Sequence, residues 1–105
     1  MSSFKDHCAD CVRELGEPFG EVHHWLDEHC ATYSADHRCI RHHRVAVEKV
    51  RQMWGDRAAR AAEIHIADDC EGIPTLRDAY DAGYYKLAFG SKAVEQLERE
   101  FPTEL

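Results

Sequence analysis

The chain has 105 residues, 44% of them hydrophobic and 31% charged, a composition typical of one globular domain, so we expect a single domain over residues 1–105. Its net charge of −7 argues against nucleic acid as the main partner. The sequence shows neither a run of about 20 apolar residues nor a signal-peptide pattern, so we expect no membrane span and a cytoplasmic location.

Residues that cap or end helices divide the chain into pieces of helical length. Ser3 is suited to cap a first helix, and Gly16 and Gly55 are suited to end the first and third. We expect helices over residues 4–15, 18–31, 35–54 or 37–54, 56–70, 76–87 and 92–101, with a turn at residues 72–75. Sustained polar–apolar alternation, which indicates strands, is missing. The sequence therefore predicts an all-α fold, a compact bundle of five to six helices.

Eight histidines are an unusual number for this length, and we placed them on the helical faces. His23 lies at the edge of the apolar arc of the second helix, and Asp27 follows one turn later. His43 lies at the centre of the apolar stripe of the third helix. On the fourth helix, His65 is centred among alanines and Asp69 follows one turn on. Three helices thus direct a histidine toward the core.

The spacing of four residues stacks each aspartate beside its histidine on one helical face, where both can bind one cation. We therefore expect a divalent-metal site built from His23, Asp27, His43, His65 and Asp69. Mixed nitrogen and oxygen ligands favour zinc first, with manganese or iron as alternatives. The competing interpretation is that each aspartate accepts a hydrogen bond from its histidine and that no metal binds.

The other histidines fall outside the apolar centres. His37 and His42 lie on opposite flanks of the third helix and are secondary ligand candidates. His7, His24 and His29 are expected at the surface.

A sulfur site is the next alternative. Cys8 and Cys11 have the C-x-x-C spacing, and a hairpin of the first two helices would bring Cys30 near them. A second C-x-x-C is missing, and Cys39 and Cys70 have no such pattern. A free cysteine is often a small buried hydrophobe. A metal-handling or metal-sensing protein using these thiols nevertheless stays open.

Hydrolysis by metal-bound water is the one enzymatic mechanism that the residue inventory supports. The metalloprotease, phosphate-loop and dinucleotide-binding motifs are all missing. In such a hydrolase, Asp36 or Asp68 would serve as general base, and Arg38 or Arg41 would hold a small anionic substrate. A non-catalytic protein-interaction module with structural His–Asp pairs is the rival from another class. A homodimer contact through Trp25, Tyr84 or Tyr85 also stays open.

Several ordered motifs resemble a bacterial and phage family described only as a domain of unknown function. They are His23-x-Trp25-Leu26-Asp27, His37-Arg38-x-x-Arg41-His42-His43, His65-x-x-x-Asp69, and Gly72-Ile73-Pro74-Thr75 followed by Asp78. The resemblance covers about residues 20–80. It departs where Ala46 or Val47 replaces a usual glycine and where Tyr80 follows in place of an Asp-Trp pair. The family implies no activity, but its motif draws attention to His37 and His42.

Overall fold

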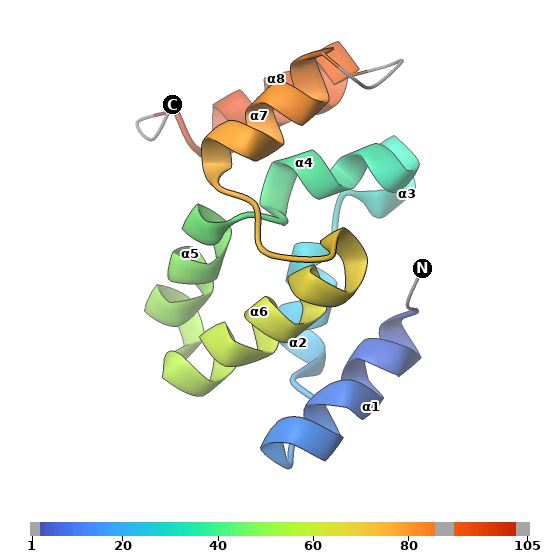
Figure 1. Ribbon diagram of the computed structural model, residues 1–105, viewed down its shortest axis with the longest axis vertical. Helices are drawn as coiled ribbons and strands as arrows, with labels where there is room; N and C mark the ends of the chain where they lie inside the picture. The colour runs from blue at the N-terminus through green and yellow to red at the C-terminus, as the bar shows by residue number, and fades with distance from the viewer. Residues whose placement is uncertain (1–2, 86–89, 103–105) are drawn as a thin grey trace.

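A computed structural model describes residues 3–85 and 90–102, and every regular element in these ranges is helical (Figure 1). Six helices have seven residues or more, and three shorter elements lie between the second and the third of them. The long helices are α1 (Phe4–Leu15), α2 (Gly20–Leu26), α5 (Arg44–Trp54), α6 (Asp56–Cys70), α7 (Leu76–Tyr85) and α8 (Gly90–Glu100). The short ones are α3 (Cys30–Tyr33), the 3-10 helix η1 (Ser34–His37) and α4 (Arg38–Arg41). The predicted all-α bundle is confirmed.

Helix ends follow the capping residues where those residues are strong. The Ser3 hydroxyl accepts from the Asp6 N–H while the Asp6 carboxylate accepts from the Ser3 N–H, which begins α1. Gly16 ends α1 in the left-handed region at φ +83°. Thr75 and Asp78 form the same reciprocal pair at the start of α7. The predicted ends of α1 and the predicted start of α7 are therefore confirmed.

The predicted second and third helices were wrong in their length, because the chain turns twice inside them. The second stops at Leu26, where Asp27 leaves the helical conformation. The third breaks at His42 and His43, and His43 is extended at φ −155° and ψ 171°. The Arg44 N–H then donates to the Pro74 carbonyl oxygen at 2.9 Å instead of to a helical carbonyl. A tertiary hydrogen bond thus holds the break.

The helices pack in two groups. In one group α1, α2 and α5 all contact α6, whose Ala58, Ala59, Ala61 and Ala62 are fully buried. These small side chains let the neighbouring helices approach closely. In the other group α7 and α8 pack against each other and against α4 (Figure 1). Leu97 and Phe101 of this group are buried with Ala46 of α5, which joins the two groups.

The end of the helix expected at residue 87 and the side chains of Tyr84 and Tyr85 lie outside the described residues. Among the described helices, none is long and apolar enough to cross a membrane.

Candidate metal centre

Four side chains from three parts of the chain converge beside the last two turns of α6. Asp27 follows α2, His42 lies between α4 and α5, and His65 and Asp69 are one turn apart on α6. The imidazoles of His42 and His65 are fully buried, and Asp69 exposes only 3% of its side chain. Asp27 exposes 29%, so the group reaches solvent on the Asp27 side.

The facing atoms of these four residues are almost equally spaced. His65 Nε2 lies 3.1 Å from Asp27 Oδ1, 3.2 Å from His42 Nε2 and 3.4 Å from Asp69 Oδ2. His42 Nε2 lies 3.1 Å from Asp69 Oδ2 and 3.4 Å from Asp27 Oδ1. A tetrahedral ion with ligand bonds of roughly 2.0–2.1 Å places its donor atoms about 3.3–3.4 Å apart. Five of the six separations among the four donor atoms are therefore close to those of a tetrahedral ligand set.

A chain of ring contacts orients His65. His23 Nε2 lies 3.0 Å from the Pro18 carbonyl oxygen, which can only accept, so this nitrogen carries the proton. In a neutral His23, Nδ1 is then an acceptor, and it lies 3.0 Å from His65 Nδ1, which must donate to it. A neutral His65 consequently presents a lone pair on Nε2 to the carboxylates of Asp27 and Asp69. Hydrogen bonds of this kind commonly orient metal-ligating histidines.

His37 stands at the edge of the group. Its Nδ1 faces the Ser34 carbonyl oxygen, and its Nε2 lies 3.0 Å from Asp27 Oδ1. Both neighbours are acceptors, and a neutral imidazole carries one N–H, so it can donate to only one of them. His37 thus places a third histidine nitrogen, besides those of His42 and His65, close to Asp27 Oδ1.

The carboxylates at the centre are held in the ionised form. Burial raises the pKa of Asp27, but hydrogen bonds from His37 and His42, and from His65 when its Nε2 is protonated, outweigh it and keep the pKa far below the usual range. Asp69 behaves in the same way, with bonds from His42 and His65 opposing burial. Two negative charges therefore lie close together in a largely closed space, where only nearby cations or protons can balance them.

The histidines respond to these charges in opposite directions. Burial lowers the pKa of His65, but hydrogen bonds to Asp27 and Asp69 outweigh it, so the pKa is raised. Burial, with repulsion from His65 and His7, lowers the pKa of His23 to about 4. His65 therefore takes up positive charge more readily than His23, which stays neutral behind it.

Most of the predicted ligands are brought together, and one is not. Asp27, His65 and Asp69 belong to the group of four, and His23 contacts it through His65. His43 lies elsewhere: its Nδ1 accepts from the Ala46 N–H at 3.1 Å, and its Nε2 lies 2.8 Å from the Ile40 carbonyl oxygen. Of the secondary candidates, His42 takes a central place and His37 a peripheral one.

His7 was expected at the surface, and that expectation was wrong. The side chain is fully buried and stacks on the His65 ring at 3.6 Å between centroids. Its Nε2 lies 3.5 Å from Asp69 Oδ1. The available signal was Cys11, one turn later and also fully buried, which marks this face of α1 as internal. Of the other two expected surface histidines, His24 is exposed, and His29 is half-buried and bonded to Glu100.

The catalytic candidates separate into near and far residues. Arg38 Nε lies 4.0 Å from Asp69 Oδ2, and Arg38, Asp36 and His42 line a cavity of about 450 Å³. Arg41 is buried elsewhere: it donates to Glu100 and to the Trp25 carbonyl oxygen, and its guanidinium covers the Trp25 ring. Asp68 is exposed on α6 and lies outside the group of four. Only Arg38 and Asp36 therefore adjoin the group of four.

The cysteines are all free, and they take no part in this arrangement. Burial raises the pKa of Cys11 to about 11 and that of Cys39 to about 12, so these two thiols stay protonated at neutral pH. Among the described residues, no group of potential metal ligands contains a sulfur.

Comparison with known proteins places the chain in a family without assigning an activity. Searches of curated proteins and of solved structures find no match. A family model described as a domain of unknown function (DUF6915) matches residues 1–86, which include Asp27, His42, His65 and Asp69. Because this match covers most of the sequence, the chain belongs to the domain-of-unknown-function family DUF6915.

Proposed function

We propose that this protein binds one divalent transition-metal ion through Asp27, His42, His65 and Asp69. The observation that carries the proposal is that five of the six separations between the facing atoms of these side chains are 3.1–3.4 Å, and that all four atoms lie within 4.8 Å of one another. A set of two imidazole nitrogens and two carboxylate oxygens suits zinc best, with manganese or iron as alternatives.

The rival interpretation is a hydrogen-bonded network without a metal. In that network a second proton on His65 takes the place of the cation, because His65 Nδ1 already donates to His23 and only Nε2 faces the carboxylates. The raised pKa of His65 shows that the carboxylates favour such a proton. The two interpretations differ in whether a metal ion displaces this proton at neutral pH.

Elemental analysis of the purified protein, before and after chelator treatment, tests the proposal. We expect about one zinc per chain and a lower melting temperature once the chelator has removed it, because the energy of ion binding adds to folding stability. The variant Asp69→Asn should lose the metal, whereas His24→Ala, which removes an exposed histidine of α2, should retain it. Less than about 0.2 metal per chain, with melting unchanged by chelator, would contradict the proposal.

We further propose that the metal serves a hydrolase of small anionic molecules, which bind in the cavity of about 450 Å³ beside His42. The supporting observation is Arg38, whose buried Nε has no hydrogen-bond partner in the described structure and whose side chain lines the cavity. A guanidinium in this position suits a carboxylate or phosphate. A bound cation that took one water as a fifth ligand would lower the pKa of that water, and Asp36 in the same wall would accept its proton. The proposal places this activity in the cytoplasm.

Hydrolysis of 4-nitrophenyl phosphate, compared with the uncharged ester 4-nitrophenyl acetate, tests this second step. We expect metal-dependent turnover of the anionic ester, and Arg38→Met should raise KM for it about tenfold or more while zinc content stays unchanged. Equal KM values for wild type and Arg38→Met would contradict the role of Arg38. The absence of any metal-dependent turnover would contradict the hydrolase and leave the metal-binding proposal intact.

A further inference from the structure

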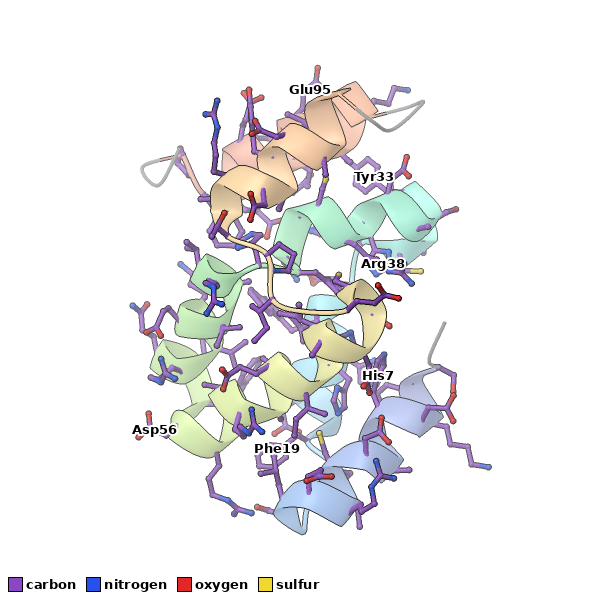
Figure 2. The ribbon with its side chains drawn as sticks, viewed as in Figure 1. His7, Phe19, Tyr33, Arg38, Asp56 and Glu95 are labelled. Atoms are coloured by element: carbon purple, nitrogen blue, oxygen red, sulfur yellow. The ribbon has the colours of Figure 1, made fainter. Side chains whose placement is uncertain are left out.

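A second group of potential ligands lies where α1 packs against α6. It consists of His7 and Asp10 from α1 and Asp68 from α6, and each offers a ligand atom within 4.8 Å of the others. Figure 2 shows the labelled His7 beside the last turns of α6, on the opposite side from Arg38. None of these three residues belongs to the group at Asp27 and Asp69.

His7 is the unusual member of this group. It is fully buried, yet neither ring nitrogen has a hydrogen-bond partner in the described structure. Its nearest acceptor is Asp69 Oδ1, which lies 3.5 Å from Nε2 and is itself without a hydrogen bond. A buried polar group without a partner destabilises the fold, so its retention needs an explanation. Binding of an ion by one ring nitrogen would supply the missing partner.

The two carboxylates of the group crowd each other. A carboxylate oxygen of Asp10 and one of Asp68 lie within 4.8 Å of each other and of a ring nitrogen of His7. Arg13 donates to Asp10 Oδ1 at 2.7 Å, which balances one of the two charges at the rim. Two carboxylates that share so little space need a proton or a cation between them. A cation there would be close to the buried imidazole as well.

We propose that His7, Asp10 and Asp68 form a second divalent-cation site, separate from the first. One nitrogen and two carboxylate oxygens, with Asp10 and Asp68 reaching solvent, favour manganese with coordinated water over zinc. The buried His65 stacks on His7, and Asp69 directs one oxygen to each group, so the two sites adjoin without sharing a proposed ligand. The second site rests on its own three residues and does not depend on the first.

Titration of the chain with Mn²⁺, in the presence of one equivalent of Zn²⁺, tests the second site. Electron paramagnetic resonance reports free Mn²⁺, and we expect one bound Mn²⁺ per zinc-loaded chain. The double variant Asp10→Asn with Asp68→Asn should weaken Mn²⁺ binding at least about tenfold and leave zinc content unchanged. The matched control is Glu14→Gln with Glu63→Gln, which removes the same charge from the same two helices in the groove that also contains Asp10 and Asp68.

The outcomes separate the two sites. Equal Mn²⁺ affinity in the wild type and the Asp10/Asp68 variant, or a matching loss in the control variant, would overturn the second site. So would a wild-type chain that binds no Mn²⁺. If the wild-type chain binds Mn²⁺ but never holds zinc, and the Asp10/Asp68 variant loses the Mn²⁺, the result would support the second site and contradict the first. His7→Ala should weaken Mn²⁺ binding as much as the Asp10/Asp68 variant does. Unchanged Mn²⁺ binding in His7→Ala would overturn the assignment of His7 as a ligand.

Discussion

His65 and His43 occupy two regions that look alike by burial and differ in chemistry. Both imidazoles are fully buried, His65 within α6 and His43 at the N-cap of α5. His43 stands at the start of α5, where its ring meets the edge of Phe101 at 4.8 Å between centroids. His65 stands near the end of α6, between the carboxylates of Asp27 and Asp69.

The difference lies in what each ring nitrogen faces. His43 Nε2 faces the Ile40 carbonyl oxygen and donates to it, while Nδ1 accepts from the Ala46 N–H. One neutral tautomer therefore satisfies both nitrogens. At His65, Nδ1 donates to His23, and Nε2 is left facing two negative oxygens and another imidazole nitrogen. Burial of a histidine does not identify a ligand; an unmatched lone pair beside carboxylates does.

The largest expected effect comes from His65→Ala. This variant should reduce bound zinc from about one ion to less than about 0.2 per chain, because a tetrahedral set loses a central donor. With free zinc at 1,000 times the dissociation constant, ion binding contributes about 4 kcal/mol to the free energy of unfolding, and the variant should lose this amount. Denaturant unfolding with and without chelator measures it. A wild-type metal content in His65→Ala would show that the comparison with His43 is wrong.

The helix ends could be predicted where the local sequence decides them. Ser3, Gly16 and Thr75 cap or end helices through their own side chains or φ values, and the structure follows them. The break at His42 and His43 contains no glycine or proline, and a hydrogen bond from Arg44 to the distant Pro74 holds it. A tertiary contact of this kind leaves no local pattern to read.

The candidate site divides in the same way. His65 and Asp69 sit on one unbroken helix, so their spacing predicted their shared face. For His42 and His43, the helical periodicity assumed a continuous helix, and the break exchanges their roles: His42 enters the group and His43 caps α5. Convergence of separate helices depends on packing, which explains why the proximity of His7 to Asp69 could not be predicted.

The pH dependence of stability gives the next largest effect. In the metal-free protein the pKa of His23 is lowered to about 4 from 6.5, so its contribution to stability is present above pH 6.5 and is lost as pH falls toward 4. This loss amounts to about 3 kcal/mol. The pKa of His65 is raised, so its contribution is present below pH 6.5 and is lost as pH rises through that raised value.

The metal-free protein should therefore be most stable near pH 6.5, with Asp27 and Asp69 losing their contributions only below about pH 3.8. Urea unfolding in chelator between pH 4.5 and 8.5 measures the profile. His23→Gln should flatten the acid side alone. A free energy of unfolding that rises steadily from pH 4.5 to 8.5 would show that the carboxylates of Asp27 and Asp69 do not raise the pKa of His65.

His43→Ala should destabilise the protein by about 2 kcal/mol, because it removes a helix cap and leaves a gap beside Phe101. The loss should be the same with zinc and with chelator, and zinc content should stay at the wild-type value. Denaturant unfolding under both conditions provides the measurement. A larger loss of stability in the presence of zinc than in the presence of chelator would place His43 among the groups that support metal binding. It would also remove the contrast with His65.

Glu100→Gln tests an ion pair in the same region as His43 and should have the smallest effect. Glu100 accepts from Arg41 Nε at 2.7 Å, and although burial raises its pKa, the bonds from Arg41 and Gln96 outweigh it and lower the pKa below 4.5. The variant should lose about 1 kcal/mol at pH 7. This difference from wild type should vanish as pH falls below 4.5 through the lowered pKa, because the stability from a carboxylate with a depressed pKa is lost on protonation. Zinc content should not change, because Arg41 and Glu100 stabilise the packing of α4 on α8 and have no contact with the ligands proposed here. A drop in zinc content would mean that this ion pair also positions His42, the residue that follows α4.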